Sequence, residues 1–162
     1  MAASVKKTDS YMIFNGIDNQ IVEFKITNYE FPDAKFGDWD GNWLLIYLNV
    51  KSNVGYWQTI DPSLTTWEMK ELIDWFKDLS NNKKPKNKCL DFTEPNLSFE
   101  HIGYNQNKCL IRLRFELESR PQSADDDKDY FVDFEYNANE IKQVIIDLTN
   151  EINNFPERKG LG

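Results

Sequence analysis

Residues 65–80 read TTWEMKELIDWFKDLS and contain the clearest folding signal of the chain. Thr65 and Glu68 form a capping-box pair, in which the hydroxyl and the carboxylate each accept a free backbone N–H of the first helical turn. Apolar side chains then recur at helical spacing on one face: Met69, Leu72, Ile73, Phe76 and Leu79. The segment therefore predicts an amphipathic helix that ends near Ser80 and packs one face against a core.

Strand patterns lie on both sides of this helix. They cover residues 11–14, 20–29, 43–50 and 56–60 before it, and 89–92, 97–102, 108–118 and 130–136 after it. Because 43–50 is nearly all apolar, we expect a central strand there that is covered on both faces. Asn137 and Glu140 cap a second helix, which Pro156 ends. The order strands, helix, strands, helix predicts an α+β fold, with a mostly antiparallel sheet of about seven to eight strands and two helices packed on it.

The composition describes one acidic domain. With 162 residues, of which 40% are hydrophobic and 28% charged, the chain has room for a single core, so we expect one domain over residues 1–162. Residues 1–10 and the tail 157–162 are expected to be flexible. No segment has the length and apolarity needed to span a membrane, and we expect a cytoplasmic protein.

The formal charge is 19 − 27 = −8. A field of this sign repels phosphate backbones and anionic membranes, so nucleic acid and membrane surfaces are poor partners. It suits a basic protein partner, because complementary fields accelerate association. The alternative is that the charge only keeps the protein soluble.

The cysteines and the histidine offer no catalytic set. Cys89 and Cys109 each enter a predicted strand in a Lys-Cys-Leu triplet, which favours buried free thiols. The single histidine, His101, is in phase with Leu97 and Phe99, so we expect it to point inward or to lie at the sheet margin. A catalytic triad or a zinc site would need further partners. The sequence therefore predicts a protein without catalysis, metal or cofactor.

Asp38, Asp40 and Asn42 alternate as at the start of an EF-hand calcium loop. The match then fails, because Trp43 stands where the loop needs a glycine and Asn49 where it needs a bidentate glutamate. A turn whose Asp and Asn side chains bond the local backbone explains the pattern better.

Carboxylates are frequent enough for chance pairs to resemble a hydrolase site. We expect the last two strands to pair so that Arg114 lies beside Asp133 and Arg112 beside Glu135. Such cross-strand ion pairs stabilise a sheet by roughly 0.2–1 kcal/mol each, and they explain these charges without a catalytic role. A small hydrolase that uses paired carboxylates stays an alternative.

Two predicted loops carry clusters of like charge. Residues 83–88 hold four lysines without interleaved aromatics, which favours a solvated loop over a nucleic-acid site. The run of three aspartates at 125–127 suits either a solvated loop or contact with a basic partner. From exposure and charge, we expect the contact residues for such a partner to be Asp38, Trp39, Asp40, Asp125, Asp126 and Asp127.

Three parts of the chain resemble the WapI-type immunity proteins of bacteria in order and spacing. They are NYEFPD (28–33) with WDGNWL (39–44), DPSLTTWE (61–68), and FTEPNL (92–97) with FELE (115–118). The resemblance runs from about Gln20 to Phe155 and rests on turns, a helix cap and strand starts. It implies a small cytoplasmic protein that neutralises the C-terminal domain of a contact-dependent, wall-associated toxin by binding it. A non-catalytic interaction domain with another role is the alternative.

Overall fold

Two antiparallel sheets of consecutive strands form the body of the protein, whose computed structural model describes residues 12–34 and 39–159. The first sheet, in spatial order, comprises β1 (Met12–Asn15), β2 (Ile21–Tyr29), β3 (Trp43–Ser52) and β4 (Gly55–Thr65). The second comprises β5 (Cys89–Asp91), β6 (Leu97–Asn105), β7 (Lys108–Phe115) and β8 (Tyr130–Tyr136). The α+β class and the element order are confirmed, and the eight strands divide equally between two sheets.

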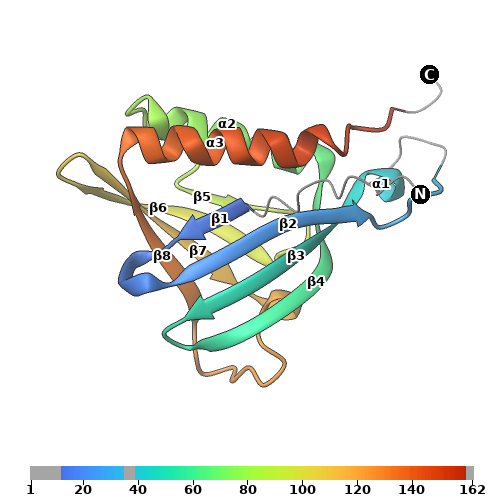
Figure 1. Cartoon of the computed structure of the whole chain (residues 1–162), viewed down its shortest axis with the longest axis horizontal. Helices are drawn as coiled ribbons and strands as arrows, with labels where there is room; N and C mark the ends of the chain where they lie inside the picture. The colour runs from blue at the N-terminus through green and yellow to red at the C-terminus, as the bar shows by residue number, and fades with distance from the viewer. Residues whose placement is uncertain (1–11, 35–38, 160–162) are drawn as a thin grey trace, which may run out of the picture.

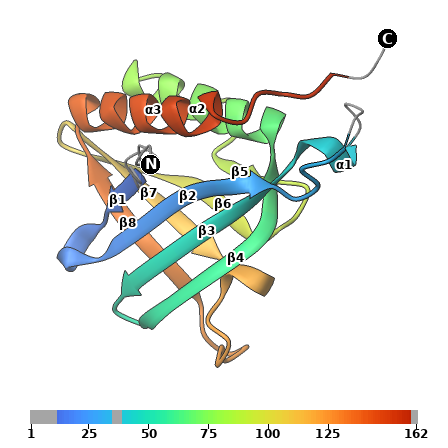
Figure 2. The same ribbon diagram turned by 45° about the vertical axis from the view of Figure 1, so that its right-hand side comes forward.

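Two long helices cover one open end of the sheet pair. The helices are α1 (Trp39–Asn42), α2 (Thr66–Ser80) and α3 (Ala138–Asn153), and the short 3₁₀ turns are η1 (Ile17–Asn19) and η2 (Leu117–Ser119). Figures 1 and 2 show α2 and α3 side by side above the sheets, with α1 at the far end of the first sheet. No helix in the described part of the chain is long and apolar enough to cross a membrane.

Phenylalanine rings join the two sheets and the helices in one core. Phe14 of β1 lies 5.2 Å from Phe134 of β8, measured between ring centroids. Its ring also lies 6.0 Å from Phe99 of β6 and 6.3 Å from Phe76 of α2. All four rings are fully buried, so a residue of the shortest strand in the first sheet contacts every layer of the fold.

The predicted helix caps are confirmed. Glu68 donates its backbone N–H to the Thr65 hydroxyl at 3.2 Å, and its carboxylate accepts the Thr65 N–H at 3.0 Å. The same carboxylate accepts the N–H of Thr93 at 2.8 Å, which ties the start of α2 to the chain between β5 and β6. Asn137 and Glu140 form the equivalent pair at the start of α3.

The prediction that residues 43–50 form a strand covered on both faces is wrong. Leu44 and Leu48 point into the core and are buried. Leu45 and Tyr47 point outward and are only partly buried, because no helix or sheet within residues 12–34 and 39–159 covers that side. An apolar run does not by itself show that both faces of a strand are covered.

The arginine–carboxylate ladder exists, but its register differs by two residues from the predicted one. Arg112 lies opposite Asp133, not Glu135, and binds that carboxylate through Nε at 2.7 Å and Nη2 at 3.0 Å. Arg114 donates Nη1 to Glu100 of β6 at 2.7 Å. A shift of two residues keeps every side chain on its face, so the alternation of apolar and polar residues cannot distinguish the two registers.

The two cysteines are free and lie in different surroundings. Cys109 is buried as predicted, and burial raises the pKa of its thiol to about 11. Cys89 is exposed, contrary to the prediction. It begins the short edge strand β5, in which Leu90 is the side chain that points inward.

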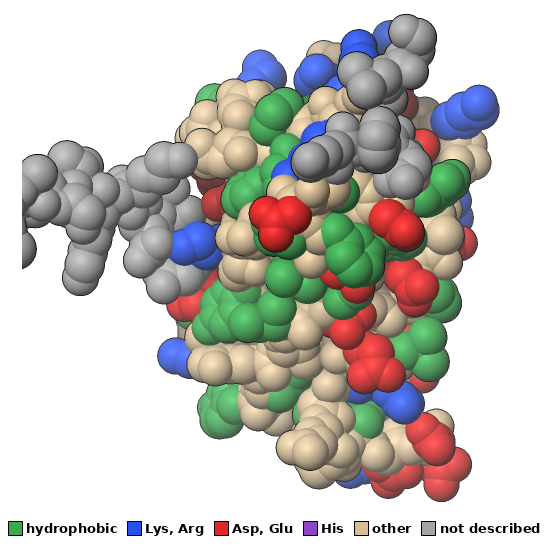
Figure 3. All heavy atoms as spheres, turned by 90° about the vertical axis from the view of Figure 1, so that its right-hand side faces the viewer, with side chains coloured by type: hydrophobic (Ala, Val, Ile, Leu, Met, Phe, Trp, Pro, Cys, Tyr) green, Lys and Arg blue, Asp and Glu red, His purple; other side chains and the backbone are tan. Residues whose placement is uncertain are grey.

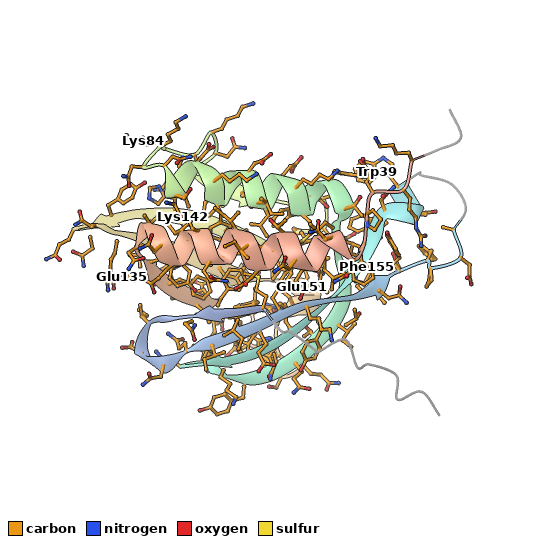
Figure 4. The ribbon with its side chains drawn as sticks, turned by 45° about the horizontal axis from the view of Figure 1, so that its top comes forward. Trp39, Lys84, Glu135, Lys142, Glu151 and Phe155 are labelled. Carbon is orange, nitrogen blue, oxygen red and sulfur yellow. The ribbon has the colours of Figure 1, made fainter. Side chains whose placement is uncertain are left out.

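Glu151 fastens α3 to the first sheet. Its buried carboxylate accepts the backbone N–H of Ile26 at 3.0 Å, next to the irregularity in the β2–β3 register between Ile26 and Asn28 (Figure 4). Burial raises the pKa of Glu151, and the hydrogen bond from Ile26 opposes this shift. At a given pH, the folded state therefore holds a larger fraction of this carboxyl protonated than the unfolded chain does.

Replacing Glu151 by Gln should make stability less dependent on pH. Because the folded-state pKa of Glu151 lies above its ordinary value of 4.5, the wild-type protein gains stability in acid and loses it as the pH rises through that pKa. The E151Q variant keeps an acceptor for Ile26 but does not titrate. Urea denaturation should show the unfolding free energy of the wild type falling relative to E151Q between pH 4.5 and neutrality. E71Q, at an exposed position of α2, is the control, and a constant difference over this range would contradict the prediction.

Candidate functional site

Trp39 of α1 is an exposed tryptophan at one end of the first sheet. The Trp39 side chain is 53% exposed, although most large rings of this protein are buried. It packs edge-on against Trp67 of α2, with 4.7 Å between ring centroids, and lies 6.4 Å from Trp43 of β3. Two further tryptophans therefore pack against Trp39, which Figure 4 shows at the α1 end of the molecule, and about half of its side chain stays exposed.

Carboxylates from separate segments gather around Glu30. Burial raises the pKa of Glu30, which follows β2, and the charges of Asp40, Asp61 and Glu94 raise it further. We call these four residues the acidic edge. Figure 3 shows that Asp and Glu side chains collect on this side of the molecule. Asp40 is exposed, as expected of a contact residue, whereas Asp38 lies outside the described residues.

The side chain of Asn42 has hydrogen-bond partners in distant parts of the chain. Its buried side chain accepts a hydrogen bond from the Thr66 hydroxyl at 2.8 Å and another from the Arg158 N–H at 2.9 Å. Its amide nitrogen donates to the Arg158 carbonyl at 2.9 Å. These partners are distant in sequence, so Asn42 anchors the end of α1 to the start of α2 and to Arg158. No group of three or more His, Cys, Asp or Glu side chains among residues 12–34 and 39–159 could hold a metal ion.

The Arg158 guanidinium holds the turn that precedes α1. Its Nη1 donates to the carbonyls of Phe31 at 2.8 Å and Ala34 at 3.3 Å, and Nη2 donates to the carbonyl of Pro32 at 2.8 Å. The guanidinium also stacks on Tyr29, 3.6 Å from the ring centroid. Three carbonyls and one ring therefore converge on a single side chain.

These contacts were not predicted from the sequence, in which residues 157–162 were expected to form a flexible tail. The Tyr29 hydroxyl donates to the Pro156 carbonyl at 2.6 Å, and the Phe155 ring meets Tyr29 edge-on at 5.4 Å. We call residues 155–158 the C-terminal clamp. No local pattern identifies the clamp, because its partners lie more than 100 residues earlier in the chain.

The second predicted contact cluster lies elsewhere. Asp125, Asp126 and Asp127 are exposed in the loop after η2, at the lower end of the molecule in Figure 1, well below α1. Asp126 pairs with Arg120 at 3.1 Å, and Asp125 accepts the Asp127 N–H at 2.9 Å. The structure therefore does not bring the two predicted clusters together into one patch.

His101 is buried at the margin of the core, as predicted. Burial lowers the pKa of its imidazole, and a backbone hydrogen bond with Gly103 opposes this shift. Its ring lies edge-on to Tyr104 at 4.8 Å, and its Nε2 atom has no hydrogen-bond partner. Among the described residues, the imidazole thus contacts the backbone of Gly103 and the ring of Tyr104.

Two hollows among the described residues differ in their lining from a site with paired carboxylates. A depression of 590 Å³ is lined by Asn82, Tyr104, Gln106, Asn107, Asn137, Ala138 and Asn139, so its walls supply amides and one phenol. A second hollow, of 340 Å³, contains Glu71, Asp74 and Asp78. All three come from α2, so they do not face each other across the hollow as the carboxylates of a glycosidase do.

Replacing Arg158 by Ala should free α1 while the rest of the fold stays intact. The variant loses three carbonyl hydrogen bonds and the stacking on Tyr29. We expect faster amide hydrogen exchange at Trp39 to Asn42 and an unfolding free energy lower by about 1–2 kcal/mol.

Two further variants test this prediction about the clamp. R158K should restore little protection, because an ammonium group cannot bond three carbonyls in the geometry of the guanidinium fork. K159A changes the exposed neighbour and should leave exchange as in the wild type. Unaltered exchange at Trp39 in R158A would show that the clamp does not position α1.

Comparison of the sequence with known protein families identifies the family of this chain. A family model described as the immunity protein WapI-like family matches residues 12–156, which include both sheets and all three helices. Neither a curated protein nor a solved structure matches the chain. The match confirms the resemblance seen in the turn and cap segments and covers most of the sequence. The chain belongs to the WapI-like immunity protein family.

Proposed function

We propose that this protein binds the C-terminal domain of a cognate toxin and neutralises it in the cytoplasm, without catalysis of its own. The observation that carries the proposal is the family match over residues 12–156, because it ties the whole fold to immunity proteins. The toxin partner would be basic, since the chain has a net charge of −8.

The acidic edge and Trp39 support a contact surface at α1. A large ring that is exposed yet held by packing is a typical anchor of protein interfaces, because little conformational entropy is lost when it is buried. The face of an indole ring also attracts cationic side chains, which suits a lysine or arginine of the toxin. The carboxylate of Asp40, next in the chain, would pair with such a group.

Crowding of like charges at the acidic edge adds a driving force. The pKa of Glu30 is raised partly because the carboxylates of Asp40, Asp61 and Glu94 lie nearby. A toxin cation placed among them would relieve this repulsion and lower the pKa of Glu30. The 125–127 loop would act at longer range, by steering a basic partner toward the acidic side of the molecule.

Co-expression tests the function directly. The toxin domain encoded next to this chain should arrest growth when expressed alone, and adding this protein should restore growth and yield a complex that copurifies. Failure of both rescue and copurification would reject neutralisation by binding. Rescue without a complex would favour an enzymatic or indirect route.

Charge reversal tests the contact surface. D40K and the triple variant D125K/D126K/D127K should each slow association with the toxin domain and weaken its salt dependence, because both remove charges that attract a basic partner. Stopped-flow association at several salt concentrations measures both effects. D74K reverses one exposed carboxylate of α2 and changes the net charge by the same amount as D40K, so it is the charge control for that variant. A variant with the same rates as D74K would exclude its cluster from the interface.

A further inference from the structure

A basic loop joins α2 to β5 at the end of the molecule opposite α1. Figure 4 shows Lys84 of this loop at that end. Two hydrogen bonds fix the backbone of the loop to the fold. Trp75 Nε1 donates to the Asn87 carbonyl at 2.8 Å, and the His101 N–H donates to the Lys88 carbonyl at 2.8 Å. The backbone that carries the lysines is therefore anchored.

Three lysines of this loop have no acidic partner. The side chains of Lys83, Lys84 and Lys88 are exposed, and no carboxylate within residues 12–34 and 39–159 forms an ion pair with them. Lys86 differs, because it lines the 340 Å³ hollow together with three carboxylates of α2. The chain has 27 acidic and 19 basic residues, so three neighbouring lysines without a partner form a local exception to its acidity.

The fold places an aromatic ring beside these lysines. Tyr104 of β6 is 45% exposed and lines the 590 Å³ hollow together with Asn82, which directly precedes the lysines. The Tyr104 ring also lies 4.8 Å from that of His101, and the charges of Lys88 and Lys84 contribute to the lowered pKa of this histidine. The lysine run itself contains no aromatic residue, so β6 supplies the ring that its sequence lacks.

Amide side chains make up much of the lining of the 590 Å³ hollow. Asn82, Gln106, Asn107 and Asn139 belong to it, and none of these four side chains has a hydrogen-bond partner in the described part of the chain. Each carboxamide offers a donor and an acceptor, the combination with which Asn and Gln pair with base edges. The hollow therefore presents hydrogen-bonding groups next to a positive surface.

We propose that this end of the molecule binds single-stranded nucleic acid. Lys83, Lys84 and Lys88 contact phosphates, the Tyr104 ring stacks on a base, and the amides of the hollow hydrogen-bond base edges. An acidic peptide matches the lysines equally well, but its carboxylate side chains bring no flat ring for Tyr104. The combination of cations, ring and amides therefore favours bases and phosphates.

The net charge of −8 opposes this binding and keeps it modest. The Debye length is about 8 Å at physiological salt, so the carboxylates at the α1 end are screened while the lysines contact phosphates directly. Two carboxylates near the hollow already accept hydrogen bonds. Glu135 accepts from the Asn105 amide at 3.4 Å, and Glu140 accepts from the Asn137 N–H at 3.0 Å. The proposal goes beyond toxin binding and does not depend on it, so either function can fail without the other.

Fluorescence anisotropy of a labelled single-stranded RNA of about 12 nucleotides tests the proposal with this chain alone. We expect a dissociation constant of about 100 µM or less at about 50 mM salt, and binding weaker by about tenfold at about 200 mM salt. K83E/K84E should raise the dissociation constant by about tenfold or more. K51E/K128E is the matched control, because it reverses two exposed lysines elsewhere and changes the net charge equally. A wild-type chain that does not bind, or an equal loss in both double variants, would overturn the proposal.

Variants of Tyr104 separate stacking from charge. Y104A should raise the dissociation constant by about fivefold or more, whereas Y104F should bind as the wild type does, because stacking needs the ring and not the hydroxyl. The side chain is 45% exposed, so circular dichroism should show an unchanged fold in both variants. A glutamate peptide with as many charges as the RNA should bind more weakly. Equal affinity for the peptide and the RNA, or wild-type affinity in Y104A, would reject nucleic acid as the ligand.

Discussion

Burial of the Phe14 ring is the contact on which the two-sheet architecture depends. The ring touches the first sheet, the second sheet and α2 at once, so neither sheet is a separate unit. The turn that follows β1 is equally constrained. A Cβ atom at Gly16 would lie 2.6 Å from the Val132 side chain and 3.1 Å from the Asp133 carbonyl, so only glycine lets this turn approach β8. The shortest strand of the first sheet, together with the turn after it, thus packs directly against the second sheet.

The sequence predicted correctly those features that depend on interactions between residues close together in the chain. The capping boxes at Thr65 and Asn137 involve residues three apart, and both formed as expected. The sequence showed which side chains point inward but did not show how eight strands divide between sheets. The register of β7 against β8 depends on the long loop between them, which contains η2 and which no alternation pattern describes.

The candidate site was predictable only in part, for the same reason. The prediction that Trp39 and Asp40 are exposed followed from their place in a polar loop, and the structure agrees. Asp61 and Glu94 come from β4 and from the chain before β6, so only the folded chain brings them to Glu30. Their proximity could not be predicted from the sequence, because an acidic protein has many carboxylates and nothing in the sequence distinguishes these from the others.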